Sequence, residues 1–138
     1  MKYQWTNKLI LFAEDDEASL IYLSELLKRN NASVIHCSSG LKAFNYCMEN
    51  PLIDLVLMDM KLPELDGFEA TRMIKRLKPS LPIIAVTACV MLEDRRRCKI
   101  AGCDGFLPKP IMPNEFLPMV NYFLNLQKTK SYSDYSNY

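Results

Sequence analysis

The hydrophobic positions of the chain fall into short apolar runs that are separated by longer amphipathic segments. Five runs have the length of strands, and they cover residues 9–13, 34–37, 52–58, 81–86 and 104–107. The run at 52–58 is apolar on both faces and lies between Pro51 and Pro63, which is typical of a central parallel strand with helices on each side. Asp59 follows this run directly, and ligands of open α/β sheets bind just outside the carboxyl ends of the strands. The central run therefore predicts both the middle of a sheet and a candidate site residue.

Between the apolar runs, hydrophobic residues recur at the spacing of helices. Helices are predicted from Asp16 to about Asn30, over residues 41–48, 68–77 and 92–101, and onward from Pro113. Asp16 suits an N-cap, Gly102 a C-terminal stop and Pro113 a first helical position. Because five strands alternate with five helices through short connections, the pattern predicts a doubly wound α/β domain with a five-stranded parallel sheet.

The two ends of the chain differ from this domain, which we place at residues 8–127. Residues 1–7 form a polar lead-in that includes Trp5, and residues 128–138 are rich in Ser, Tyr, Asp and Asn without an apolar period. A segment of this composition buries too little apolar surface to offset its conformational entropy. We therefore expect the tail to be a disordered segment or a linker.

Composition excludes several classes of function. The chain has 138 residues, of which 49% are hydrophobic, so it fits one domain with a substantial core. A formal net charge of +1 argues against direct nucleic-acid binding, and Arg95, Arg96 and Arg97 are interpreted as a solvated helix face. No apolar run is long enough for a membrane span and no cleavable signal is visible, so we expect a cytoplasmic protein without membrane contact.

Five cysteines are scattered along the chain, and only Cys98 and Cys103 are close in sequence. Their C-x4-C spacing, with His36 as the single histidine and no second pair, argues against a zinc site. In a chain without a secretory signal, we expect reduced thiols rather than a disulfide framework.

Chemically active side chains follow four of the predicted strands. Glu14 and Asp15 follow the first run, Asp59 the third, Thr87 the fourth and Lys109 the fifth. The carboxyl ends of parallel strands meet at one edge of a sheet, so these groups are expected to converge. Clustered carboxylates repel one another unless a hard cation such as Mg²⁺ neutralises them. The set predicts a phosphoryl site in which a cation bridges carboxylate and phosphoryl oxygens.

With its neighbouring residues, this set resembles the receiver domain of bacterial response regulators and hybrid sensor histidine kinases, over roughly residues 8–126. The matching pieces are Glu14-Asp15 after a strand, Met58-Asp59 followed by Leu62-Pro63 and Asp66-Gly67, Val86-Thr87-Ala88, and Gly102-Cys103-Asp104-Gly105-Phe106 before Lys109-Pro110. Each piece alone is weak, but all of them in this order are highly specific. The resemblance implies a flavodoxin-like receiver fold and a two-component signalling function, and it is strongest to the receivers of hybrid kinases.

The resemblance also implies roles for the acidic residues. Asp59 would accept a phosphoryl group from a partner histidine kinase or a histidine phosphotransfer domain. Asp15 would be a direct Mg²⁺ ligand, Glu14 would bind the metal through water, and the Lys61 backbone carbonyl would be a main-chain ligand. Asp16 and Glu17 would then belong to the start of the first helix.

Further implied roles concern the phosphoryl group and the switch. Thr87 and Lys109 would contact the phosphoryl group, Phe106 would be the mobile switch aromatic, and Lys109-Pro110 would be a cis peptide. Cys89 and Lys61 occupy variable positions that tune dephosphorylation in the family. Output would be a surface change near the fourth and fifth helices that a downstream protein or a linked domain recognises, and the sequence leaves a homodimer open.

Two other functions compete with this one. A small Mg²⁺-dependent phosphohydrolase of the haloacid dehalogenase type also uses a strand-end Asp as its nucleophile, but it needs a second Asp two residues later, where this chain has Lys61. A degenerate receiver would bind partners without phosphorylation. The complete set of acids, hydroxyl and lysine favours a phospho-acceptor domain rather than an enzyme.

Overall fold

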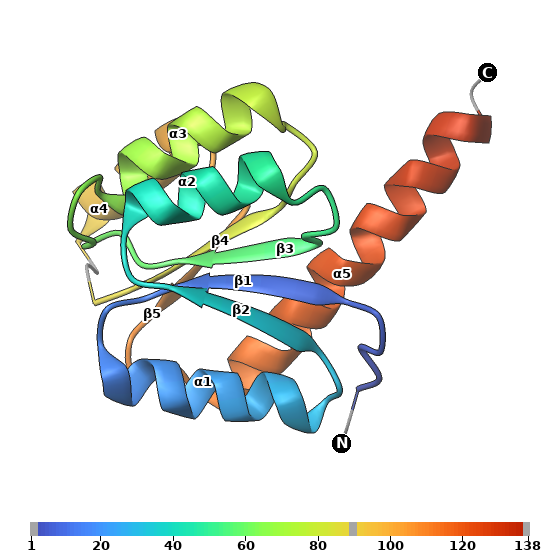
Figure 1. Ribbon diagram of the computed structural model, residues 1–138, viewed down its shortest axis with the longest axis horizontal. Coiled ribbons are helices and arrows are strands. Elements are labelled where there is room, and N and C mark those ends of the chain that lie inside the picture. The colour runs from blue at the N-terminus through green and yellow to red at the C-terminus, as the bar shows by residue number, and fades with distance from the viewer. Residues whose placement is uncertain (1–2, 89–90, 137–138) are drawn as a thin grey trace.

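A computed structural model describes residues 3–88 and 91–136, and side chains from Tyr3 to Leu126 within these ranges. Cys89 lies outside the described residues. One parallel sheet with the order β2-β1-β3-β4-β5 forms the centre of the molecule (Figure 1). Its strands are β1 (Leu9–Ala13), β2 (Ser33–Cys37), β3 (Leu55–Met58), β4 (Ile83–Thr87) and β5 (Gly105–Pro108).

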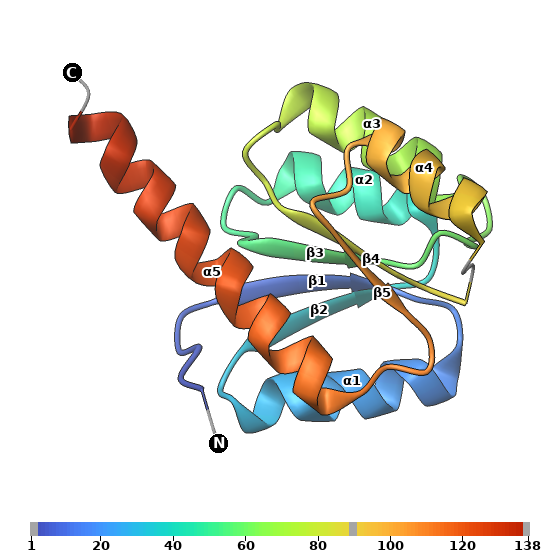
Figure 2. The same ribbon diagram turned by 180° about the vertical axis from the view of Figure 1, so that it is seen from behind.

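Helices cover both faces of this sheet (Figures 1 and 2). They are α1 (Glu17–Arg29), α2 (Gly40–Glu49), α3 (Gly67–Leu77), α4 (Leu92–Ala101) and α5 (Pro113–Ser136). α1 and α5 lie on one face, whereas α2, α3 and α4 lie on the other. The predicted doubly wound α/β fold is confirmed.

Each face of the sheet contributes to a separate hydrophobic core, because successive strand residues point to opposite faces. In β3, Val56 belongs to the core under α2 and α3, and Leu57 belongs to the core under α1 and α5. Both side chains are fully buried. This explains why the central strand is a continuous apolar run and not an alternating one.

Local capping interactions fix where the helices begin and end. Asp16 accepts a hydrogen bond from the Ser19 amide at 3.0 Å, which caps α1 as predicted. Asp66 caps α3 in the same way through the Glu69 amide at 2.9 Å. Gly102 ends α4 with a φ of 107°, a left-handed conformation that favours glycine.

The central strand is shorter than predicted, because β3 begins at Leu55 and not at Leu52. Leu52 lies in a turn and 72% of it is exposed. The Asp54 carboxylate accepts a hydrogen bond from the Leu9 amide at 2.8 Å, and regular pairing between β1 and β3 starts with Ile10 and Leu55. The Asp54 amide also donates to the Leu9 carbonyl at 2.8 Å, so a side-chain bond and a backbone bond together join the two chains just before β3 begins.

Both ends of the chain also differ from the expectation. Trp5 is 3% exposed, its amide donates to the Asn30 carbonyl at 2.8 Å, and its indole N–H donates to Asn121 at 3.0 Å. This part of the lead-in therefore packs into the core between α1 and α5. At the other end, α5 continues through Ser136 and projects beyond the sheet, over residues that were expected to be a disordered segment or a linker (Figures 1 and 2).

The length of α5 has a local explanation. No Gly or Pro follows Pro118, and extending an existing helix adds a hydrogen bond for each residue that becomes ordered. The composition of this segment, which suggested disorder, does not contain a residue that stops a helix. Among the described residues, no helix has the combination of length and apolar character that crossing a membrane requires.

Candidate functional site

The acidic residues after β1 and β3 meet at the carboxyl edge of the sheet, as the sequence predicted. Glu14 and Asp59 are buried and Asp15 is exposed. One carboxylate oxygen of each residue lies within 4.8 Å of the others. β1 and β3 pair in parallel with Ala13 opposite Met58, so the residues that follow them are neighbours.

Lys109 completes the cluster from the end of β5. Its ammonium nitrogen lies 2.7 Å from Glu14 Oε1 and 3.2 Å from Asp59 Oδ2. Its backbone amide donates to the Thr87 carbonyl at 2.9 Å, which joins the ends of β4 and β5. Thr87 is fully buried, and the Lys109-Pro110 peptide is cis as predicted. A single cation therefore bridges the two buried carboxylates.

The electrostatics of the site follow from this burial. Loss of hydration, together with the neighbouring Asp59, raises the pKa of Glu14 to about 7, although Lys109 and the Asp16 amide act in the opposite direction. Burial lowers the pKa of Lys109, but its contacts with Glu14 and Asp59 outweigh burial and leave that pKa above the ordinary value. The cluster therefore favours added positive charge.

Backbone contacts fix the turn that carries Asp59. The Asp59 amide donates to the Ala13 carbonyl at 3.0 Å, and the Lys61 amide donates to Asp59 Oδ1 at 3.0 Å. Gly67 packs against the same turn, because a Cβ at this position would lie 2.2 Å from the Asp59 carbonyl oxygen. The Lys61 carbonyl belongs to this turn, and its role as a metal ligand stays a prediction.

The two predicted switch residues lie on neighbouring strands. Thr87 ends β4, and Phe106 lies on β5 opposite Ala85. Phe106 is half-buried, and the Arg95 guanidinium lies 4.9 Å from the centre of its ring. Arg97 similarly lies 3.9 Å from the centre of the Phe68 ring on α3. Arg95, Arg96 and Arg97 are all exposed, which agrees with their interpretation as a solvated helix face, and two of them also lie over aromatic rings.

His36 was assigned no role from the sequence, but it lies beside the site. Its Nε2 atom is 2.9 Å from the Glu14 carbonyl oxygen. The parallel register places Phe12 opposite His36, so the residues after β1 pass the end of β2. The pairing of β1 with β2 is the signal that sequence reasoning lacked.

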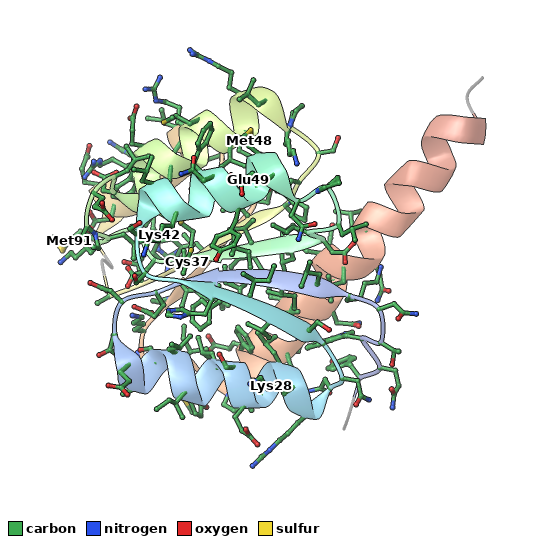
Figure 3. All side chains as sticks on the ribbon, viewed as in Figure 1. Lys28, Cys37, Lys42, Met48, Glu49 and Met91 are labelled. Atoms are coloured by element: carbon green, nitrogen blue, oxygen red, sulfur yellow. The ribbon has the colours of Figure 1, made fainter. Side chains whose placement is uncertain are left out.

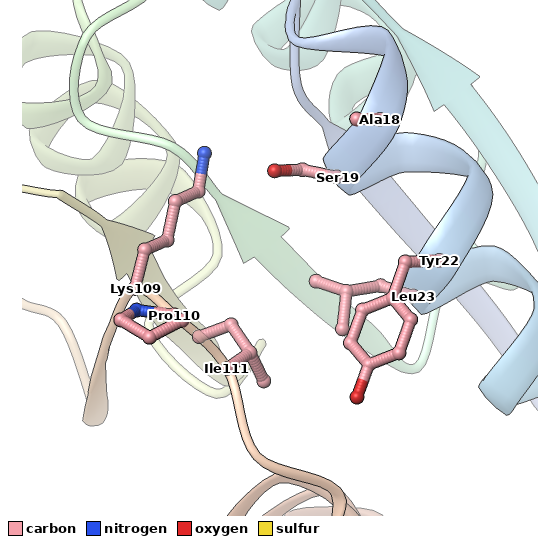
Figure 4. A pocket seen from close by; sticks show the side chains of 7 residues that line it. All are labelled: Ala18, Ser19, Tyr22, Leu23, Lys109, Pro110 and Ile111. Atoms are coloured by element: carbon pink, nitrogen blue, oxygen red, sulfur yellow. The ribbon is translucent and has the colours of Figure 1, made fainter.

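An open cleft adjoins the lysine between α1 and the segment after β5. Its volume is about 370 Å³, and Ser19, Tyr22, Lys109 and Ile111 are among its lining residues (Figure 4). Lys109 and Ser19 extend toward the space between the two elements. The cleft leaves one side of the Lys109 ammonium reachable from solvent.

Comparison with known proteins identifies the family. The family model of the response regulator receiver domain matches residues 10–121, and the chain belongs to this family. The polar-differentiation response regulator DivK of Brucella ovis is 33% identical over 120 residues, which are 86% of this chain and 97% of that protein.

Solved structures agree with this assignment. A CheY-like response regulator receiver domain protein from Methanospirillum hungatei has a TM-score of 0.82 at 28% identity, covering 89% of this chain and 98% of that one. The receiver domain of a sensor histidine kinase from Pseudomonas aeruginosa, which was crystallised with a magnesium ion in its active-site cleft, has a TM-score of 0.79 at 30% identity, covering 86% and 98%. The receiver fold that the sequence predicted is confirmed.

Proposed function

We propose that Asp59 accepts a phosphoryl group from a histidine kinase or a histidine phosphotransfer domain, and that phosphorylation changes a surface which a downstream protein or a linked domain binds. The observation that carries this proposal is the position of Lys109, whose ammonium contacts both Glu14 and Asp59. A buried carboxylate next to a fixed cation and a second acid has the charges that phosphoryl transfer requires. The domain that does this extends over residues 8–127, with the lead-in around Trp5 packed onto it.

The donor set fits Mg²⁺. It consists of hard carboxylate oxygens within reach of one another, and the buried pair is neutralised only in part by Lys109. Asp15 and Asp59 would bind the ion directly, Glu14 through water, and Lys61 through its backbone carbonyl. When bound, Mg²⁺ would neutralise negative charge on the carboxylates and on the phosphoryl oxygens.

The residues of the chain have distinct parts in the transfer. A carboxylate oxygen of Asp59 attacks the phosphorus while the bond from phosphorus to the donor's imidazole nitrogen breaks, so the bond electrons return to the imidazole. Lys109 can move from Asp59 toward the transferred oxygens and match their charge. The Thr87 hydroxyl at the end of β4 would donate to another of these oxygens.

Phosphorylation of Asp59 tests this proposal directly. Wild-type protein with Mg²⁺ and acetyl phosphate should gain the mass of one phosphoryl group, and Asp59→Asn should not. Asp54→Asn is the matched control, because Asp54 precedes the opposite end of the same strand and accepts a hydrogen bond from the Leu9 amide. Equal labelling of the Asp59→Asn variant would refute the assignment of Asp59 as the phospho-acceptor. Absence of labelling in the wild type would identify a degenerate receiver.

The metal ligands have a separate test. Asp15→Ala should weaken Mg²⁺ binding in calorimetry much more than Asp16→Ala, because Asp16 caps α1 through the Ser19 amide. Asp16→Ala should instead lower stability by about 1 kcal/mol. If both variants lose Mg²⁺ affinity equally, the assignment of the metal ligand to Asp15 is wrong.

A further inference from the structure

The last turn of α4 brings two cysteines together. The Cys103 amide donates to the Cys98 carbonyl at 2.9 Å, and the Gly102 amide donates to the Lys99 carbonyl at 3.1 Å. With Gly102 in the left-handed conformation, these two bonds define a Schellman motif. A contact between the side chains of the first and sixth residues frequently accompanies this motif, and here these residues are Cys98 and Cys103.

The environment of the two thiols agrees with this placement. Cys98 is 2% exposed and belongs to the core under α3, whereas Cys103 packs against the same core and is partly exposed. A hydrogen bond between the thiols lowers the pKa of Cys98 and raises that of Cys103. Cys98 therefore has the greater thiolate character, and Cys103, its hydrogen-bond partner, is the thiol that is partly open to solvent.

Two other cysteines provide a contrast within the same core. Cys37 and Cys47 are buried, and burial raises the pKa of Cys37 to about 11 and that of Cys47 to about 12 (Figure 3 labels Cys37). All four cysteines that the structure describes are free thiols. Burial is the main influence at Cys37 and Cys47, so neither gains the thiolate character that reaction with oxidants requires.

We propose that Cys98 and Cys103 are an oxidation site, where a hydroperoxide converts the dithiol reversibly into an intramolecular disulfide. The thiolate of one cysteine attacks the peroxide, the O–O bond breaks, and a sulfenic acid and one molecule of water or alcohol form. The second sulfur then attacks the sulfenic sulfur, the S–S bond forms, and the oxygen leaves as water. Two thiols lose two electrons, the peroxide gains two, and an external dithiol reverses the reaction.

The backbone favours this reaction, because the Schellman hydrogen bonds already close the loop that the disulfide would close. The bridge would join the last turn of α4 to the segment that enters β5. Arg95 lies one turn before Cys98, and Phe106 lies three residues after Cys103. Oxidation would therefore restrict the two elements that contact each other through Arg95 and Phe106, and the inference stands independently of phosphorylation at Asp59.

Thiol counting tests the proposal in the full chain. A Cys89→Ser background leaves four of the five cysteines, namely Cys37, Cys47, Cys98 and Cys103. The reduced protein is treated with hydrogen peroxide, quenched, unfolded in denaturant and alkylated with N-ethylmaleimide. We expect the loss of two alkylation sites and of two hydrogen atoms in the intact mass, a cross-linked peptide that contains Cys98 and Cys103, and full recovery with dithiothreitol.

Variants locate the site. In Cys98→Ala and in Cys103→Ala, peroxide should no longer remove two alkylation sites, because the disulfide cannot form. In Cys37→Ala, peroxide should still remove two sites. Peptide mapping of the protein with both cysteines intact keeps the test valid if Cys98→Ala does not fold. The proposal is wrong if all four thiols survive peroxide, if the disulfide joins other cysteines, or if oxidation stops at a sulfinic acid without a disulfide.

Discussion

Helices α3 and α4 are neighbours on the same face of the sheet, but they contact the domain in different ways. The backbone in the first turn of α3 packs closely against the turn at Asp59. This contact leaves no space for a side chain at Gly67. Ala70, Thr71 and Ile74 of this helix are fully buried. α3 is therefore part of the structure that fixes the turn of Asp59, the proposed phospho-acceptor.

α4 buries fewer side chains. Cys98 and Ala101 are its buried residues, whereas Leu92 and Ile100 are exposed, and Met91 projects from its N-terminus (Figure 3). Arg95 and Arg97 add contacts in which each guanidinium lies over an aromatic ring. Contacts of this kind are each worth about 0.5–1 kcal/mol at exposed positions. α3 is therefore held by a close backbone contact and by buried side chains, and we expect α4, which buries fewer residues, to change its position at lower cost.

Gly67→Ala should give the largest effect. Alanine favours helices, so a loss of stability would have to come from the contact between the new Cβ and the Asp59 turn, 2.2 Å away in the present geometry. We expect a loss of about 3 kcal/mol in the free energy of unfolding, measured by urea denaturation, with slower phosphorylation. Ile100→Ala on α4, where the side chain is 83% exposed, should stay within about 0.5 kcal/mol. Equal losses at both positions would remove the distinction between the helices.

The dependence of the free energy of unfolding on pH should also depend on the site, through Glu14. Glu14 has a raised pKa, so the folded state binds a proton more strongly than the unfolded state. Its contribution to stability is complete below the ordinary pKa of 4.5, falls as pH rises from there, and is lost above about 7. Without metal, we expect the domain to lose on the order of 3 kcal/mol of stability between pH 4.5 and 8 through this group.

Glu14→Gln separates this effect from other titrations. The variant has no charge at this position, so its stability should fall less than that of the wild type over the same pH range. Thermal denaturation at matched ionic strength measures the difference. Parallel pH profiles for the two proteins would show that Glu14 does not carry the effect.

Sequence patterns predicted those features that depend on local periodicity and on strand order. The apolar runs gave the sheet, and the residues after each run gave Glu14, Asp59 and Lys109, because every strand of a parallel sheet delivers its next residue to one edge. Trp5 was not placed, since its partners Asn30 and Asn121 are distant in the sequence. The ring contacts of Arg95 and Arg97 were missed for the same reason: an exposed helix position does not reveal which side chain lies beside it.

Arg97→Ala tests how α4 is attached to α3. Removing the guanidinium over Phe68 should lower the free energy of unfolding by about 0.5–1 kcal/mol and leave phosphorylation intact. Arg96→Ala, an exposed residue in the same turn, is the matched control and should cost less. Denaturation curves of the two variants give the comparison. If Arg96→Ala is as costly as Arg97→Ala, the loss reflects helix propensity or net charge and not the ring contact.

Arg95→Ala should have a small effect on stability, and its main effect should be on Phe106, the predicted switch residue. Phe106 has no hydroxyl that needs a partner, so we expect its inward and outward rotamers to be closer in energy than those of a tyrosine at this position. The Arg95 contact favours the rotamer seen here by about 0.5–1 kcal/mol, which is roughly a two- to fivefold change in the rotamer ratio. Without it, the Phe106 ring should populate the alternative rotamer more before phosphorylation, and beryllofluoride should then change its NMR signals less than in the wild type. Arg96→Ala should behave like the wild type in this measurement. A Phe106 ring that responds identically in Arg95→Ala and wild type would show that α4 does not influence the switch through this contact.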